Sequence, residues 1–118
     1  MSETDLKRAI LDGLERLGFW ACRLNAGMKG RVRMAPKGTP DILVLAPYLW
    51  LEVKLPGEDL LPTQVTWHER AKRDGVPVVV VYSVDDAIKA VRGAVMLESR
   101  ERYRTLQEAL YRLTGRGI

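Results

Sequence analysis

The sequence predicts an α/β protein, a mixed β-sheet with helices on its faces, in the order α-β-β-β-α-β-α-α. The first observation behind this prediction is that apolar residues at helical spacing alternate with short, nearly continuous apolar runs of strand length. The second is that the 118 residues contain no internal repeat and no linker long enough to divide them. We therefore expect residues 1–118 to form a single domain.

The first predicted element is a helix over residues 2–17. Ser2 is a suitable N-cap and Gly18 suits the helix end. The apolar stripe of this helix consists of Leu6, Ile10, Leu14 and Leu17. Glu3 lies at the N-terminal end of the stripe, where its carboxylate either complements the helix dipole or belongs to a functional site.

The next predicted elements are strands. Residues 19–24 are rich in aromatic and apolar side chains, as is typical of a strand. A basic segment with several glycines follows, and a short strand at residues 31–34 is one interpretation of it. Residues 40–45 (PDILVL) and 49–55 (LWLEVKL) are predicted as two further strands, joined by a turn at residues 46–48.

Helices dominate the second half of the chain. Pro62 suits the first position of a helix over residues 62–74. Residues 77–82 (PVVVVY) are then predicted as a buried strand. Two helices follow, over residues 85–91 and 98–113, and we interpret the second as a C-terminal extension.

The charge of the chain suits a polyanionic partner. The formal net charge is only +4, but a stretch without any acid contains Lys29, Arg31, Arg33 and Lys37. This cluster is either a solvated basic loop or a nucleic-acid contact. No apolar run reaches the length of a membrane span, and the single cysteine, Cys22, favours a reducing, cytoplasmic setting.

Three residues of the predicted strands, Asp41, Glu52 and Lys54, are candidates for chemistry. Side chains of a strand alternate between its two faces, so Glu52 and Lys54 point the same way. Two strands joined by a short turn pair residues whose numbers are symmetric about that turn. The turn at residues 46–48 therefore places Asp41 beside either Glu52 or Lys54, with Cβ atoms about 5 Å apart.

Two carboxylates at this separation repel each other unless a cation neutralises them. Mg²⁺ prefers oxygen ligands and keeps waters that a substrate phosphate can replace. It would lower the pKa of a bound water and polarise a phosphoryl oxygen, while Lys54 would orient the water or stabilise developing charge. The pattern thus indicates phosphodiester hydrolysis, with a purely structural ion pair as the alternative.

The segments around these residues resemble a nuclease motif. GTPDILVL followed by WLEVKLP is similar to the PD-(D/E)XK pattern, with Asp41, Glu52 and Lys54 at its charged positions. More narrowly, the chain resembles the VRR-NUC family, the virus-type replication and repair nucleases. The similarity covers about residues 3–92 and runs through Glu3, RLNAG, KGTPD, LEVK, PTQVTWHERAKRDG and YSVDDA.

This resemblance implies a restriction-endonuclease-like fold and a role for each residue of the motif. Asp41 and Glu52 would bind Mg²⁺ or Mn²⁺, the Val53 carbonyl would be a third protein ligand, and Lys54 would be the catalytic lysine. Glu3 would contact the metal directly or through water.

The resemblance also reaches the helix over residues 62–74. Gln64 would support the lysine or the substrate, whereas without the resemblance it is a surface residue of the helix. His68 is interpreted as a surface residue and left outside the site, because a solitary histidine on a helix is usually exposed. The chain departs from the usual pattern at Leu61, where a Ser or Thr would cap the helix.

The function that the resemblance implies is a metal-dependent endodeoxyribonuclease acting on structured DNA. Branched DNA and four-way (Holliday) junctions would be its substrates, in DNA repair or phage replication, and two copies would pair as a homodimer in the cytoplasm of a bacterial or phage-infected cell. The basic cluster at Lys29, Arg31, Arg33 and Lys37 would hold phosphates near the metals. The alternatives are a nucleic-acid-binding module of the same fold without turnover, and a structural domain whose carboxylates pair with lysines.

Overall fold

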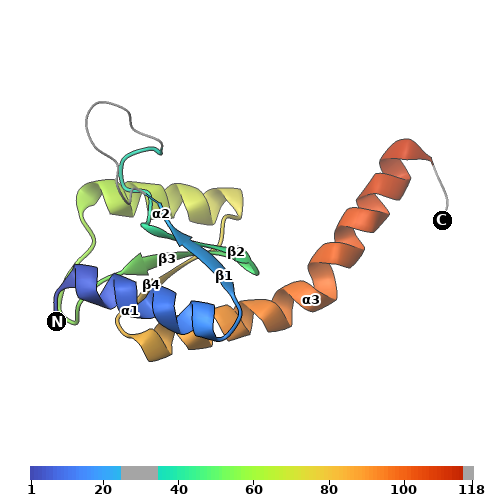
Figure 1. Ribbon diagram of the computed structural model, residues 1–118. Coiled ribbons are helices and arrows are strands. Elements are labelled where there is room, and N and C mark those ends of the chain that lie inside the picture. Colours follow the sequence, from blue (N-terminus) through green and yellow to red (C-terminus); the bar gives the residue numbers. More distant parts are fainter. Residues whose placement is uncertain (25–34, 116–118) are drawn as a thin grey trace.

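The computed structural model describes residues 1–24 and 35–115, with the side chains of residues 98–106 outside that description. Its elements follow the predicted order from the first helix to the last strand (Figure 1). They are α1 (Glu3–Arg16), β1 (Trp20–Arg23), β2 (Ile42–Ala46), β3 (Tyr48–Val53), α2 (Pro62–Asp74), β4 (Val78–Val81) and α3 (Val84–Thr114). The protein is therefore α/β, as the sequence predicts. The suggested strand at residues 31–34 lies outside the described residues.

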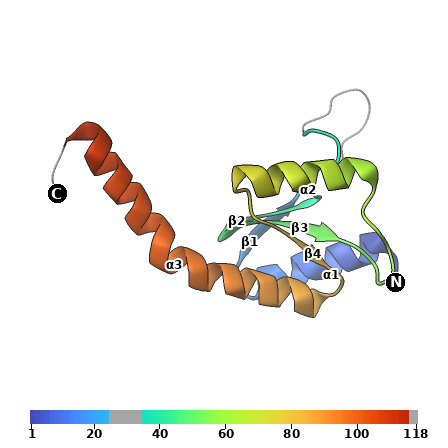
Figure 2. The ribbon, with the colours of Figure 1, turned by 180° about the vertical axis from the view of Figure 1, so that it is seen from behind.

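The end of the chain differs from the prediction in one respect. The two predicted helices over residues 85–91 and 98–113 are joined in one continuous helix, α3, of 31 residues. The intervening residues 92–97 contain no proline. Their single glycine, Gly93, costs only about 1 kcal/mol inside a helix, so nothing there forces a break. Figures 1 and 2 show the second half of α3 extending away from the sheet.

The described sheet has four strands in the order β1-β2-β3-β4. Its first two pairings are antiparallel and the pairing of β3 with β4 is parallel. A two-residue turn at Ala46–Pro47, with a cis peptide bond before the proline, joins β2 to β3. The parallel pairing requires a crossover, and α2 supplies it. Figures 1 and 2 show α2 on one face of the sheet and α1 with α3 on the other.

The hydrophobic core lies between the sheet and the pair α1 and α3. Burying one aliphatic side chain of this kind contributes about 1.5–3 kcal/mol. The core is Leu6, Ile10, Leu14, Ile42, Val44, Leu49, Leu51, Val53, Val81, Ala87 and Val91. Leu17 does not extend the stripe as predicted, because it is the C-cap of α1 and its side chain is 45% exposed. The backbone turns at Gly18, whose φ is 84°, so the helical spacing ends before that position.

Among the described residues, no helix has both the length and the apolar character that crossing a membrane requires.

Candidate functional site

The β2–β3 hairpin decides which residue faces Asp41. Ile42 pairs with Leu51, and this register, continued by one residue, sets Asp41 against Glu52 rather than Lys54. The negative charge of Asp41 also reaches Glu52, where it contributes to raising the pKa of the Glu52 carboxyl. Two carboxylates therefore meet at this end of the hairpin.

Glu52 is a buried acid, with only 4% of its surface exposed. Burial raises its pKa above the ordinary value of 4.5. A hydrogen bond from His68 and the positive charge of Lys54 lower it, but they offset only part of the increase. A cation close to such a carboxylate is favourable, because it stabilises the ionised form that burial disfavours.

His68 enters the site from α2. Its Nε2 lies 3.0 Å from Oε1 of Glu52, which corrects the interpretation of this histidine as a surface residue outside the site. Its neighbour Trp67 packs edge-to-face on Trp50 of β3, with ring centroids 5.4 Å apart. The signal for His68 was its spacing, because Gln64, His68 and Ala71 follow the i, i+4, i+7 pattern of one helix face.

Lys54 follows directly after β3 and is as buried as Glu52, with 4% of its surface exposed. Its backbone N–H donates to the carbonyl of Val81 at 3.0 Å, so the neighbouring strand β4 fixes its position. Its positive charge acts on Glu52, two residues earlier on the same strand face. The predicted neighbourhood of Glu52 and Lys54 is thus present.

The backbone N–H and C=O of Val53 face β2. The N–H groups of Trp50 and Lys54 donate toward β4. Peptide groups alternate in direction along a strand, so those of Val53 face β2. The residue opposite Val53 in the β2–β3 register is Pro40, which has no N–H to donate. The strand ladder therefore supplies no donor from that position to the Val53 carbonyl, an arrangement compatible with a carbonyl ligand.

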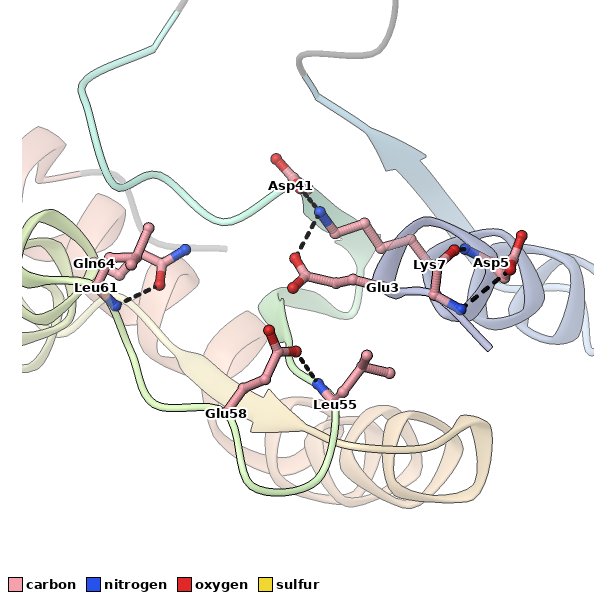
Figure 3. Close-up of polar contacts among 9 residues, drawn as sticks. Glu3, Asp5, Lys7, Asp41, Leu55, Glu58, Leu61 and Gln64 are labelled. Carbon is pink, nitrogen blue, oxygen red and sulfur yellow. Dashed lines mark hydrogen bonds and ion pairs between the residues drawn. The ribbon is translucent and has the colours of Figure 1, made fainter.

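The start of α1 brings two charged residues to the same place (Figure 3). Nζ of Lys7 lies 3.1 Å from Oε1 of Glu3 and forms an ion pair with the carboxylate of Asp41. Burial opposes the charged form of Lys7, but hydrogen bonds to Asp41 and Glu3 outweigh it, so the pKa of Lys7 is raised. Glu3 therefore lies near Asp41 by way of a lysine that the sequence reasoning did not single out.

The position of Glu3 is fixed by the capping of α1. The Asp5 N–H donates to Oγ of Ser2, and the Ser2 N–H donates to Oδ2 of Asp5, both at 3.1 Å. Such a cap contributes about 1 kcal/mol to helix stability. It also sets Glu3 in the first turn, one turn before Lys7, so both side chains project toward the end of the hairpin that holds Asp41.

Gln64 has a direct role at the start of α2. Its Oε1 accepts a hydrogen bond from the backbone N–H of Leu61 at 2.9 Å (Figure 3). Leu61 itself offers no side-chain acceptor, as the sequence predicts. Gln64 therefore supplies the side-chain capping contact at the start of α2. Support of Lys54 or of a substrate by Gln64 stays a prediction.

The segment before Asp41 packs closely against α2. Gly38 has a φ of 85°, and a Cβ at this position would lie 2.0 Å from the carbonyl oxygen of Thr63. Only glycine allows both the backbone conformation and this approach. Of the predicted phosphate-binding residues, Lys37 is described and exposed, whereas Lys29, Arg31 and Arg33 lie outside the described residues.

The donor set suits a hard divalent cation. Mg²⁺ is often held by one or two carboxylates while several waters complete its shell. Asp41, Glu52 and the Val53 carbonyl provide oxygen ligands of the type that this ion prefers. Within residues 1–24 and 35–115, no three His, Cys, Asp or Glu side chains are already arranged around a metal position. In this arrangement Lys7 binds Asp41 instead.

Comparisons of the chain with protein-family models, with curated proteins and with solved structures found no match.

Proposed function

We propose that this protein is a metal-dependent nuclease that hydrolyses phosphodiester bonds in DNA, with Asp41 and Glu52 as ligands of Mg²⁺ or Mn²⁺. The observation that carries the proposal is the facing pair itself. Asp41 lies opposite Glu52, and burial together with the charge of Asp41 raises the pKa of Glu52. A divalent cation makes such a pair favourable, and it also supplies Lewis-acid catalysis for phosphodiester hydrolysis.

Each residue of the site has a distinct task in this proposal. Asp41, Glu52 and the Val53 carbonyl hold the metal, which when bound supplies Lewis-acid chemistry at a phosphate oxygen. Lys54 carries a positive charge beside Glu52, where it orients the attacking water and stabilises the negative charge that develops on the phosphate. His68 holds one oxygen of Glu52 and so orients this ligand.

The proposed substrate is structured DNA, in particular branched DNA and four-way junctions. A four-stranded mixed sheet with helices on both faces and acids at the end of a central hairpin supports a restriction-endonuclease-like fold of the VRR-NUC type. The net charge of +4 supports a polyanionic substrate. A homodimer would present two such sites to the two strands of a symmetric junction.

One observation favours a second candidate, a structural domain whose carboxylates pair with lysines. Lys7 binds both Asp41 and Glu3. A purely structural ion pair needs no further cation, so this alternative predicts that Mn²⁺ does not bind at Asp41 and Glu52. The nuclease proposal predicts that it does.

A metal titration combined with a cleavage panel separates the two candidates. Calorimetry with Mn²⁺ is carried out on the wild type, on Asp41→Ala and on Asp85→Ala, a control at an exposed acid of α3 that pairs with Lys89. The wild type and the control should bind Mn²⁺ and cut labelled four-way junctions, while Asp41→Ala should do neither. Equal Mn²⁺ binding by all three proteins would refute the site. Binding of metal without cleavage of any junction, flap or duplex DNA would support a binding module instead.

A further inference from the structure

Lys7 is the most heavily buried lysine outside the nuclease motif among the described residues, with 9% of its surface exposed. It projects from α1 toward the end of the hairpin, where its ammonium contacts Glu3 at 3.1 Å and Asp41 in an ion pair (Figure 3). Both partners belong to the predicted site. The ammonium therefore lies where a metal bound by Asp41 would place its own positive charge.

The burial of this lysine has a physical reason. Glu3 and Asp41 are partly buried carboxylates on neighbouring elements, and they repel each other when no cation is present. A lysine is suited to reducing this repulsion, because its ammonium is a compact charge on a flexible stem that can change its partner without moving the backbone. Lys7 contacts two acids, and one of them, Asp41, faces Glu52.

We propose that Lys7 is a built-in counter-cation of the site, which offsets part of the negative charge of Asp41 and Glu3 before the divalent metal binds and must release Asp41 when the metal arrives. This inference rests on the proposed metal site at Asp41 and Glu52. Lys7 then lowers the affinity for the metal in the absence of DNA. It is a positioning residue, because it acts on the metal ligands and contacts no reacting atom.

The test is Mn²⁺ affinity, measured by calorimetry on the wild type and on Lys7→Met. Methionine keeps the length and apolar stem of lysine and removes its charge. Like charges a few ångströms apart near a protein surface repel strongly, so Lys7→Met should bind Mn²⁺ about tenfold more tightly than the wild type. In a chelator, the variant should melt below the wild type, and saturating Mn²⁺ should raise its Tm by more than it raises that of the wild type.

Two further variants make the result specific. Lys7→Gln removes the charge but keeps a hydrogen-bond donor for Asp41, so it should also bind Mn²⁺ more tightly even if Lys7→Met folds poorly. Lys89→Met removes an exposed lysine of α3 that pairs with Asp85 at 2.8 Å, and its Mn²⁺ affinity should equal that of the wild type.

The outcomes separate this inference from the proposed function. If the wild type binds Mn²⁺ through Asp41 and folded Lys7→Gln binds it equally or more weakly, the counter-cation role is refuted and the metal site stands. If neither the wild type nor the variants bind Mn²⁺, the proposed metal site fails, and the role of Lys7 fails with it.

Discussion

The two faces of the β2–β3 hairpin are made of the same strands but differ in what they bury. Toward α1 and α3, Ile42, Val44 and Leu51 are fully buried apolar side chains of the core. On the opposite face, β3 and the residue after it bury Glu52 and Lys54, two ionisable groups. Strict alternation along a strand allows both faces to exist at once. The apolar face thus holds the backbone in place, and this rigidity keeps the charges of the other face together.

The free energy of burial also has opposite signs on the two faces. Burial of the aliphatic side chains is favourable at about 1.5–3 kcal/mol each. Burial of Glu52 is unfavourable for its ionised form, as the raised pKa indicates. The core face must therefore offset the cost of the charged face, and substitutions on the two faces should have opposite consequences for stability and function.

The largest effect is expected from a substitution on the apolar face, which lowers the stability of the protein. Leu51→Ala should lower the free energy of unfolding by about 2–5 kcal/mol, because it leaves a cavity beneath β3 next to Glu52. Urea denaturation followed by circular dichroism measures this change. Leu110→Ala, at an exposed position on α3, is the matched control and should be nearly neutral. A loss below about 1 kcal/mol for Leu51→Ala would contradict the assignment of this face as the core that supports the site.

The second largest effect is expected from a substitution that alters the charged face and leaves the core intact. Lys54→Ala should reduce the rate of DNA cleavage by about 10²–10³-fold, because it removes the positive charge that stabilises the reacting phosphate. Single-turnover cleavage of a labelled four-way junction with Mg²⁺ measures the rate, and a gel-shift assay in Ca²⁺ should show retained DNA binding. Cleavage at the wild-type rate would exclude Lys54 from the chemistry.

The smallest expected effect comes from Glu52→Gln, which removes the charge of one buried carboxyl group and preserves the shape of the side chain. The pKa of Glu52 is raised in the folded protein, so its ionisation opposes folding; this cost is absent below about pH 4.5 and grows as the pH rises through the folded pKa. Metal-free Glu52→Gln should therefore melt above the wild type at neutral pH, and the two Tm values should converge below pH 4.5.

Thermal denaturation in a chelator across this pH range provides the measurement. The difference between the two curves measures the net effect of the charge at position 52, which burial and Asp41 oppose and which His68 and Lys54 favour. A Glu52→Gln protein that melts below the wild type at neutral pH would show that the ionised form of Glu52 stabilises the fold. Addition of Mn²⁺ should reverse the order of the two Tm values, because the metal stabilises the protein that retains the carboxylate.

Local chemistry made most of the fold predictable. The bounds of α2 follow from Pro62 at its first position and from Gly75, whose φ of 75° ends the helix, and they agree with the prediction at both ends. The pairing of Asp41 with Glu52 was one of two predicted registers, because a short turn constrains pairing to within a residue or two. The sequence did not predict that α3 is continuous. Residues 92–97 contain no strong helix-stop signal, and a missing stop signal indicates continuity less clearly than a proline or a capping glycine indicates an end.

The amino-acid sequence by itself determined the elements from α1 to β4, their order and the strand face shared by Glu52 and Lys54, because helix caps, turns and side-chain alternation act between residues a few positions apart. Only the tertiary structure decided that Lys7 binds Asp41 and that His68 binds Glu52. Those contacts depend on how α1 and α2 dock on the two faces of the sheet. No local pattern encodes the distance between residues that are 34 and 16 positions apart.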